Sequence, residues 1–164
     1  DSHAAYAWES WALPWHDRRQ RLARLYSTML GSLARPCGEV WMTPCARSVA
    51  VWLPASAYDS LSPEQAEGLE TATAAAFGDR MAAISEVDEL IAARRPEAGW
   101  HLVTMGTVPA AQGQGLGTAV LGPRLRALDA DGVDAVLETS DERNLSFYRR
   151  VGFAVVAELD ASAP

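Results

Sequence analysis

Apolar residues recur at helical spacing in the first part of the chain. Leu22, Leu25, Tyr26, Met29 and Leu30 follow the i, i+3, i+4, i+7, i+8 pattern. A helix turns once in about 3.6 residues, so this spacing places all five on one apolar face. Arginines crowd the start of the same helix: Arg18, Arg19, Arg21 and Arg24. We interpret these arginines as its solvated face.

Two short runs of strand-forming residues come next. Glu39–Thr43 and Ser48–Pro54 are rich in valine and tryptophan, and a turn that contains proline separates them. β-branched and aromatic side chains favour strands. The two runs therefore predict an antiparallel hairpin.

A helix-start signature follows the hairpin. Ser62 can cap the helix, Pro63 suits its first position, and Gln65 can reach back to the cap. The helix is rich in alanine, and we expect Gly78 to interrupt it. A second helix should then run from about Asp79 until Arg94-Arg95-Pro96 stops it. Its apolar side carries Met81, Ile84, Val87, Leu90 and Ile91.

Strand and helix patterns alternate in the second half of the chain. The predicted order is a strand from Trp100, a glycine loop, a helix over Thr118–Leu128, a strand over Val133–Thr139, a short helix over Asn144–Arg150 and a strand over Phe153–Leu159. Two helical crossovers between strands imply parallel strand pairs.

Length and charge limit the possible functions. With 164 residues and 49% hydrophobic residues, the chain can bury one core, and we expect one domain over residues 1–164. A net charge of −7 argues against binding to nucleic acids or anionic membranes, which require a basic face. No apolar run approaches the roughly 18 residues of a membrane span, and the first ten residues show no signal pattern. These features predict a cytoplasmic protein.

The cysteines and histidines offer no obvious metal or disulfide site. Cys37 and Cys45 flank a predicted strand and turn, and an extended chain would hold them roughly 20 Å apart. A disulfide needs a much shorter distance. Because His3, His16 and His101 are scattered along the sequence, they do not complete a zinc set. We expect neither a disulfide nor a metal.

The stretch GTVPAAQGQGLG, from Gly106 to Gly117, joins a predicted strand to a predicted helix. Such a loop suits an anion, because the first N–H groups of a helix have no partner within it. The dinucleotide motif G-x-G-x-x-G fits poorly, since the glycines are spaced G-x-G-x-G and lie late in the chain. A P-loop requires lysine, and the chain has none. Residues 112–117 match the Q-x-x-G-x-G loop that binds the pyrophosphate of coenzyme A.

A second motif follows this loop. Asn144 and Tyr148 lie four residues apart, on one face of a short helix that Gly152 ends. Together the two motifs resemble the GNAT superfamily of acetyl-CoA-dependent N-acetyltransferases, over Glu39 to about Leu159. In sequence, the two motifs most resemble the puromycin-type antibiotic N-acetyltransferases of actinomycetes.

The resemblance implies an α/β (α+β) fold. Its sheet would be mixed, mostly antiparallel and twisted, with flanking helices and a V-shaped splay between the strands at 100–108 and 133–139. In that family a first strand and helix would precede Asp1, and a last strand would follow Leu159. Either the chain is trimmed at both ends, or its sheet is completed otherwise.

The resemblance also implies an acetyl-CoA site. The pantetheine arm would enter the V and pair with the backbone around Gly106, where a bulge would free an N–H. The pyrophosphate would rest on the amides of residues 113–118, and Asn144 would bind the coenzyme from the short helix. The implied coenzyme-binding residues are Met105, Gly106, Thr107, Gln112, Gly113, Gln114, Gly115, Leu116, Gly117, Thr118 and Asn144.

Acetyl transfer also needs a proton donor, a base and an oxyanion site. Tyr148 is our candidate acid, and its alternative role is a core tyrosine beside Phe147. Glu138 and His101 are the candidate bases, with water relays or no dedicated base as alternatives. Backbone N–H groups near Gly106 would bind the carbonyl oxygen. Neither cysteine lies near the motif, so direct attack by the amine is preferred to a covalent route.

The expected acceptor is a primary amine of a small molecule. We expect Trp8, Trp11 and Trp15 to contact it, in an aromatic segment that begins at Tyr6. The same aromatic residues could instead cover the core, form a homodimer contact or recognise a protein N-terminus. The rival functions are a catalytically silent CoA-binding or regulatory domain and, more distantly, a dinucleotide-binding oxidoreductase.

Overall fold

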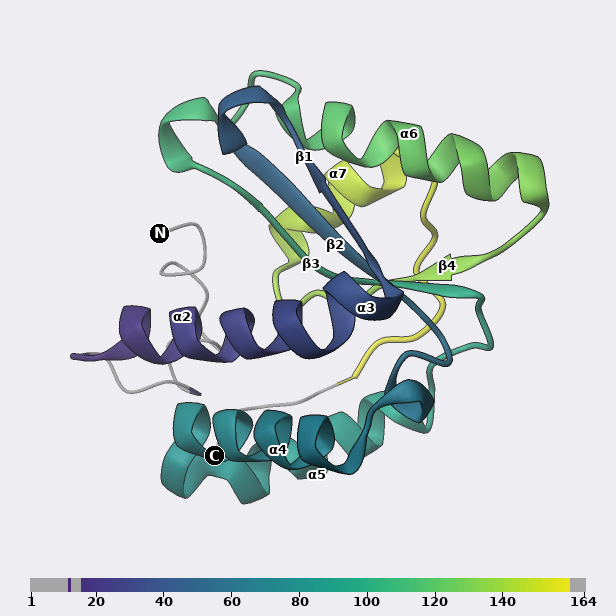
Figure 1. Cartoon of the computed structure of the whole chain (residues 1–164). Coiled ribbons are helices and arrows are strands. Elements are labelled where there is room, and N and C mark those ends of the chain that lie inside the picture. The colour runs from purple at the N-terminus through teal and green to yellow at the C-terminus, as the bar shows by residue number, and fades with distance from the viewer. Residues whose placement is uncertain (1–11, 13–15, 160–164) are drawn as a thin grey trace.

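The computed structural model describes Ala12 and residues 16–159. Its strands form one sheet with the order β1-β2-β3-β4 (Figure 1). They are β1 (Glu39–Met42), β2 (Ser48–Pro54), β3 (Trp100–Thr107) and β4 (Ala135–Val136). The α-helices are α2 (Arg18–Met29), α3 (Arg35–Cys37), α4 (Pro63–Phe77), α5 (Met81–Ala92), α6 (Leu116–Asp131) and α7 (Leu145–Arg150).

The sheet is mixed and mostly antiparallel, as predicted. β1 pairs with β2 and β2 with β3 in antiparallel fashion, whereas β3 and β4 are parallel. The predicted hairpin is therefore confirmed. Helix α6 covers one face of the sheet, and helices α2, α4 and α5 lie on the other (Figure 1). None of the helices in the described part of the chain is long and apolar enough to cross a membrane.

Strand β2 is buried on both faces. Val51 and Leu53 point into a core shared with α2, while Ala50 and Trp52 point into a core shared with α6. All four are at most 3% exposed. Because side chains alternate along a strand, a central strand with helices on both sides needs apolar residues at every position.

Helix α2 continues into α3 through a π-helical segment, Leu30–Ala34. Pro36 explains this widening. Proline has no N–H to donate to the carbonyl four residues back, and its ring clashes there. Beyond it, a side chain on Gly38 would lie 2.5 Å from the carbonyl oxygen of Trp52. A glycine at this position lets the helix end pass directly over β2.

The predicted capping box of α4 is confirmed. The Ser62 hydroxyl accepts from the Gln65 N–H at 3.2 Å, and the Ser62 N–H donates to Gln65 Oε1 at 2.9 Å. Gly78, with a positive φ of 59°, ends α4 as expected. A 3-10 turn over Gly78–Arg80 then leads into α5.

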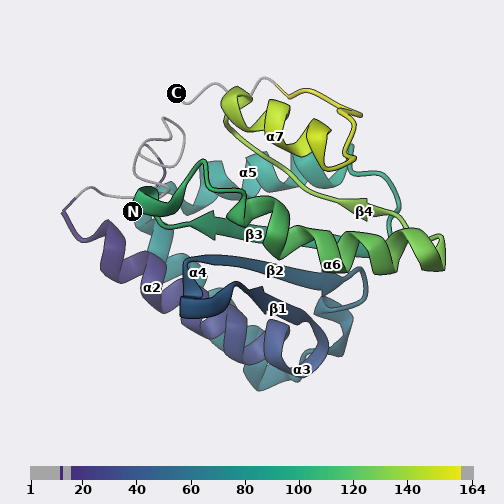
Figure 2. The same cartoon turned by 90° about the horizontal axis from the view of Figure 1, so that it is seen from above.

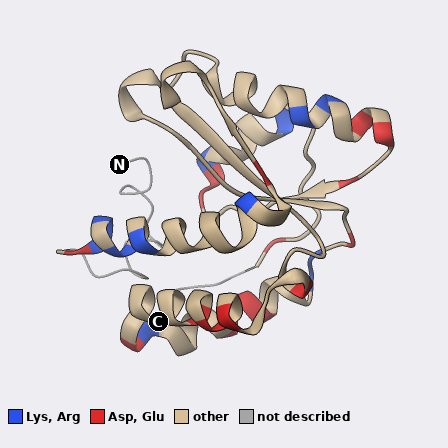
Figure 3. Ribbon diagram, viewed as in Figure 1, with Lys and Arg blue, Asp and Glu red and all other residues tan. Residues whose placement is uncertain are grey.

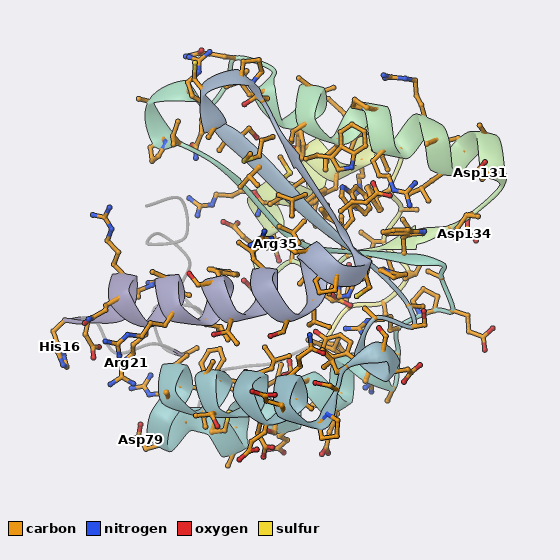
Figure 4. All side chains as sticks on the ribbon, viewed as in Figure 1. His16, Arg21, Arg35, Asp79, Asp131 and Asp134 are labelled. Carbon is orange, nitrogen blue, oxygen red and sulfur yellow. The ribbon has the colours of Figure 1, made fainter. Side chains whose placement is uncertain are left out.

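The arginines at the start of α2 are only partly solvated, which corrects the prediction of a solvated face. Arg18 is 3% exposed. Arg21 forms an ion pair with Asp17 at 2.8 Å and donates to the carbonyl of Ala75 at 2.9 Å. In Figure 4, Arg21 lies at the same end of the molecule as Asp79, where α4 ends. The unpaired carbonyls and negative dipole at a helix end attract a guanidinium.

The last two predicted strands are shorter or missing. The strand expected over 133–139 is reduced to β4, and residues 153–159 form no strand. A parallel pair therefore forms between β3 and β4, but the second expected pair does not. Val156 is 70% exposed in this unpaired segment. Strand-forming residues become a strand only beside a partner edge, and local sequence does not reveal whether an edge is available.

Candidate functional site

Strands β3 and β4 separate after a short paired stretch. Their pairing ends at His101 and Val136, although β3 continues to Thr107. The chain after β4 bends away from β3 and runs to α7 (Figure 2). In the described part of the chain, one edge of β3 therefore has no strand partner beyond His101.

The glycine loop lies between the end of β3 and α6. Gly113 and Gly115 have positive φ values of 74° and 76°, a conformation that glycine adopts without steric cost. A side chain added at either position would meet no atom within 4 Å. The loop therefore has open space in front of its backbone.

Helix α6 begins directly after this loop. Its first intrahelical bond runs from the Ala119 N–H to the Gly115 carbonyl at 3.0 Å. The N–H groups before it, on residues 116–118, have no helical acceptor. Since the first turn carries no acidic residue, the loop and the helix start can bind an anion such as a pyrophosphate.

Two glutamines brace the loop. Gln112 Nε2 donates to the Thr107 carbonyl at 3.3 Å, and Gln114 Nε2 donates to the Ala110 carbonyl at 3.2 Å. Both amides thus stabilise the loop's own backbone. This role needs no ligand, and the sequence motif did not reveal it.

Gly117 has a packing role as well. A side chain there would lie 2.8 Å from Met105 Cε and 3.0 Å from Phe147 Cζ. The glycine therefore lets the first turn of α6 approach both β3 and α7. As a result, the glycine loop and the Asn144/Tyr148 helix lie next to each other.

The open edge of β3 presents two N–H groups. The Val108 N–H bonds to the Arg47 carbonyl on the β2 side at 2.9 Å. Successive N–H groups of a strand point to opposite edges. The N–H groups of Thr107 and Met105 therefore point to the open edge, while that of Gly106 points toward β2.

The β-bulge lies at Val103 and not at Gly106, which corrects the predicted position. Val51 pairs with Thr104 and Trp52 with Leu102, so Val103 is the extra residue. Gly106 is in regular register and lacks a positive φ. Glycine permits a bulge but does not require one, so its presence was a weak signal.

The bulge changes which residues of β3 share a face of the sheet. Leu102 and Met105 pack in the core beside α6, whereas Val103 packs in the core beside α2. His101 pairs with Leu53, which belongs to the core beside α2. His101 and Met105 therefore lie on opposite faces of one strand.

The two candidate bases are in direct contact. Val136 pairs with His101, and Glu138 lies two residues further along, on the same face. His101 Nε2 is 2.6 Å from Glu138 Oε2. A third partner, Arg95, was not predicted as a site residue, and its Nε donates to Glu138 Oε1 at 2.7 Å. Arg95 was predicted only as part of a helix stop.

Electrostatics keep Glu138 ionised. Burial works to raise the pKa of Glu138, but hydrogen bonds and charges from His101 and Arg95 outweigh it and hold the pKa below its ordinary value. Asp88 on α5 is nearby. Burial raises the pKa of Asp88, Arg95 opposes this shift, and the Glu138 charge adds to it.

Tyr148 lies in α7, and Asn144 comes directly before this helix. The Tyr148 ring is half-buried and meets Phe147 edge-on at 5.2 Å and Phe153 at 6.0 Å. Asn144 Nδ2 donates to Thr139 Oγ1 at 3.2 Å. Tyr148 therefore has a packing role, and its acid role stays a prediction.

Charge is unevenly distributed around the site. Acidic side chains gather on α4 and α5 and at the end of α6 far from the glycine loop, whereas the loop itself is uncharged (Figure 3). A net charge of −7 is thus compatible with an anionic ligand at the loop. Among the described residues, no group of three or more His, Cys, Asp or Glu side chains could hold a metal. Trp8, Trp11 and Trp15 lie outside the described part.

Comparisons with known proteins match the sequence to a family and the fold to a solved structure. A sequence model of the "Acetyltransferase (GNAT) family" matches residues 65–153, more than half of the chain. The fold is similar to a crystal structure from Corynebacterium glutamicum described as "histone acetyltransferase HPA2 and related acetyltransferase", with a TM-score of 0.58 and 20% identity. The match covers 94% of this chain and 76% of the other. At this identity, the likeness shows the fold alone.

Proposed function

The chain belongs to the GNAT family of acetyltransferases, and on this premise we propose that it transfers the acetyl group of acetyl-CoA directly to a primary amine of a small molecule. One observation carries the proposal. The open glycine loop at the start of α6 lies at the end of β3, next to a strand edge that has no partner strand among the described residues. An anionic coenzyme with an extended amide-containing arm suits this combination.

Each part of the coenzyme has suitable groups in this chain. The amides of residues 113–118 would bind the pyrophosphate. The N–H groups of Met105 and Thr107, on the open edge of β3, would bind the pantetheine arm and the acetyl oxygen. Gly106 would serve only as the residue between them, since its own N–H points to β2. Asn144 would contact the coenzyme from the start of α7.

The reaction needs the amine to lose a proton and the departing thiolate to gain one. An N–H that binds the carbonyl oxygen as its charge grows is worth about 3 kcal/mol. Tyr148 would donate its hydroxyl proton to the thiolate. The neighbouring Phe147 packs against the first turn of α6, which supports a position for Tyr148 near the coenzyme.

For the amine proton we favour His101 over Glu138. Both oxygens of Glu138 are engaged, one by Arg95 and one by His101. An ionised Glu138 accepts a hydrogen bond from His101 Nε2, which leaves Nδ1 as the basic nitrogen of a neutral imidazole. Glu138 would then hold His101 in the tautomer and orientation that accept a proton.

The acceptor would approach from the face that carries α2, α4 and α5. His101 and Glu138 lie on that face, and acidic residues gather on α4 and α5, on the same side of the sheet (Figure 3). Negative charge there would attract an ammonium ion. Since the amine must be neutral to react, an α-amine with a pKa of about 8 suits better than a lysine side chain. Trp8, Trp11 and Trp15 remain our proposed contacts for it.

Two measurements test the proposal. Calorimetry should show binding of acetyl-CoA at micromolar concentrations, and a thiol-release assay should show turnover with a panel of small amines. Binding without thiol release above hydrolysis would indicate a silent CoA-binding domain instead. Release only with peptides that have a free N-terminus would redirect the acceptor from small molecules to proteins.

A further inference from the structure

Two side chains meet at the carboxylate of a third, and all three residues come from different parts of the chain. Arg95 follows α5, His101 lies near the start of β3, and Glu138 follows β4. Arg95 has no part in the proposed function so far. We propose that Arg95 is a positioning residue that fixes the Glu138 carboxylate against His101 and sets the pH at which this pair takes up a proton. The inference rests on the proposed function.

The geometry of the contact supports a positioning role. Arg95 Nε holds Glu138 Oε1 at 2.7 Å, and His101 Nε2 lies 2.6 Å from Oε2. Each oxygen thus has its own partner, so the carboxylate cannot rotate without losing one of them. A charge-assisted bond at one oxygen thereby fixes the orientation of the other.

The charges around the pair give the contact a second effect. Asp88 from α5 and Tyr58 from the 3-10 turn Tyr58–Ser60 lie within electrostatic range of both Arg95 and Glu138. With Arg95 present, its charge compensates that of Glu138. Without it, the charge of Glu138 faces His101 uncompensated, and a proton shared by the pair becomes more favourable.

The chain supplies a matched control for this residue. Arg94 precedes Arg95 and is exposed, and its Nη1 donates to the Leu90 carbonyl at 3.3 Å, at the end of α5. Replacing either arginine removes one positive charge from the same turn. Of these two arginines, only Arg95 contacts the Glu138 carboxylate.

The test is an NMR titration of the His101 ring in the coenzyme-free protein, together with the pH profile of kcat/KM. His101→Gln assigns the signal. In Arg95→Ala, the titration midpoint and the acid limb of the profile should both move to higher pH by about 0.5 to 1 unit. Arg95→Lys should restore the midpoint, because it keeps the charge, but should recover only part of kcat, because it lacks the planar fork. Arg94→Ala should change neither.

Several outcomes decide the matter. An unmoved midpoint in Arg95→Ala, or an equal movement in Arg94→Ala, would overturn the inference. Arg95→Gln, which keeps most of the side-chain stem, replaces Arg95→Ala if that variant does not fold. If the midpoint moves but no amine is acetylated, the contact with the pair stands and the proposed function fails. If turnover is normal and the midpoint does not move, the proposed function stands and the inference about Arg95 fails.

Discussion

The two sides of the site are built in different ways. On the proposed coenzyme side, one continuous segment, residues 113–118, presents backbone N–H groups, and two glycines keep the approach open. On the opposite side, Arg95, His101 and Glu138 come from separate segments, and their side chains must meet within 2.7 Å. The first side depends on local conformation, and the second depends on strand register.

This difference predicts which variants affect binding and which affect turnover. Changes in the loop should weaken coenzyme affinity, because we propose its backbone N–H groups as the binding groups. Changes on the side of His101 should lower turnover and leave coenzyme affinity unchanged. Tyr148, whose neighbour Phe147 packs against α6, tests the point where the two sides meet.

Tyr148→Phe should have the largest effect. The variant keeps the ring and its edge contacts with Phe147 and Phe153 but removes the hydroxyl proton. We expect kcat to fall by roughly 100-fold or more, with little change in the Kd of acetyl-CoA. Steady-state kinetics and calorimetry measure the two quantities. An unchanged kcat at saturating substrate would leave Tyr148 with its packing role alone.

Gly115→Val should have the next largest effect, on affinity. Its φ of 76° is unfavourable for a branched residue, and the side chain would fill the space in front of the loop. We expect the Kd of acetyl-CoA to rise on the order of 10- to 100-fold.

Gly68→Ala is a matched control for the loop variant. Gly68 lies within α4, with no atom within 4 Å of an added side chain and no positive φ. This change should leave the Kd unaltered and stabilise α4 by about 0.5 to 1 kcal/mol. Normal coenzyme affinity in Gly115→Val would show that the loop does not bind the pyrophosphate.

The sequence predicted the local features of the fold but only some of the nonlocal ones. The hairpin, the capping box of Ser62 and the glycine loop depend on neighbouring residues, and all three form as expected. The strand over 153–159 does not form, because a strand also needs a partner edge. Arg18 is buried although it begins a run of arginines, since burial depends on what packs against a helix.

The same distinction applies to the site. Glu138 and His101 were predicted as separate candidates, and only the register between β3 and β4 shows that they touch. Arg95 could not be found, because an arginine that ends a helix and one that contacts a distant carboxylate look alike in one sequence. The bulge at Val103 likewise depends on β2, its partner strand. The alternation of side chains between the two faces of a strand can be inferred from sequence, but the register between two strands cannot.

Glu138→Gln should have a smaller effect on turnover than the loss of Tyr148. The amide can still contact His101, but it no longer carries the charge that stabilises the imidazolium. We expect kcat to fall by about 10-fold, while the Kd of acetyl-CoA stays the same. Glu142→Gln, a change of the same kind at an exposed position nearby, should alter neither. A rise in Kd for Glu138→Gln would mean that the two sides of the site are not separate.

The smallest effect should be on stability, and it should depend on pH. His101 and Arg95 hold the pKa of Glu138 below its ordinary value despite burial. A carboxyl with a lowered pKa stabilises the fold fully above its unfolded pKa, and that contribution disappears as the pH falls through the folded pKa. The Glu138 side chain is 31% exposed, so solvent screening keeps the contribution small.

Urea unfolding at pH 7 should show Glu138→Gln to be less stable than wild type by about 0.5 to 1 kcal/mol, and below about pH 4 the difference should shrink toward zero. The glycine loop has no titrating group, so Gly115→Val should differ from wild type by the same amount at both pH values. A difference for Glu138→Gln that does not change with pH would mean that packing, and not charge, holds Glu138 in place.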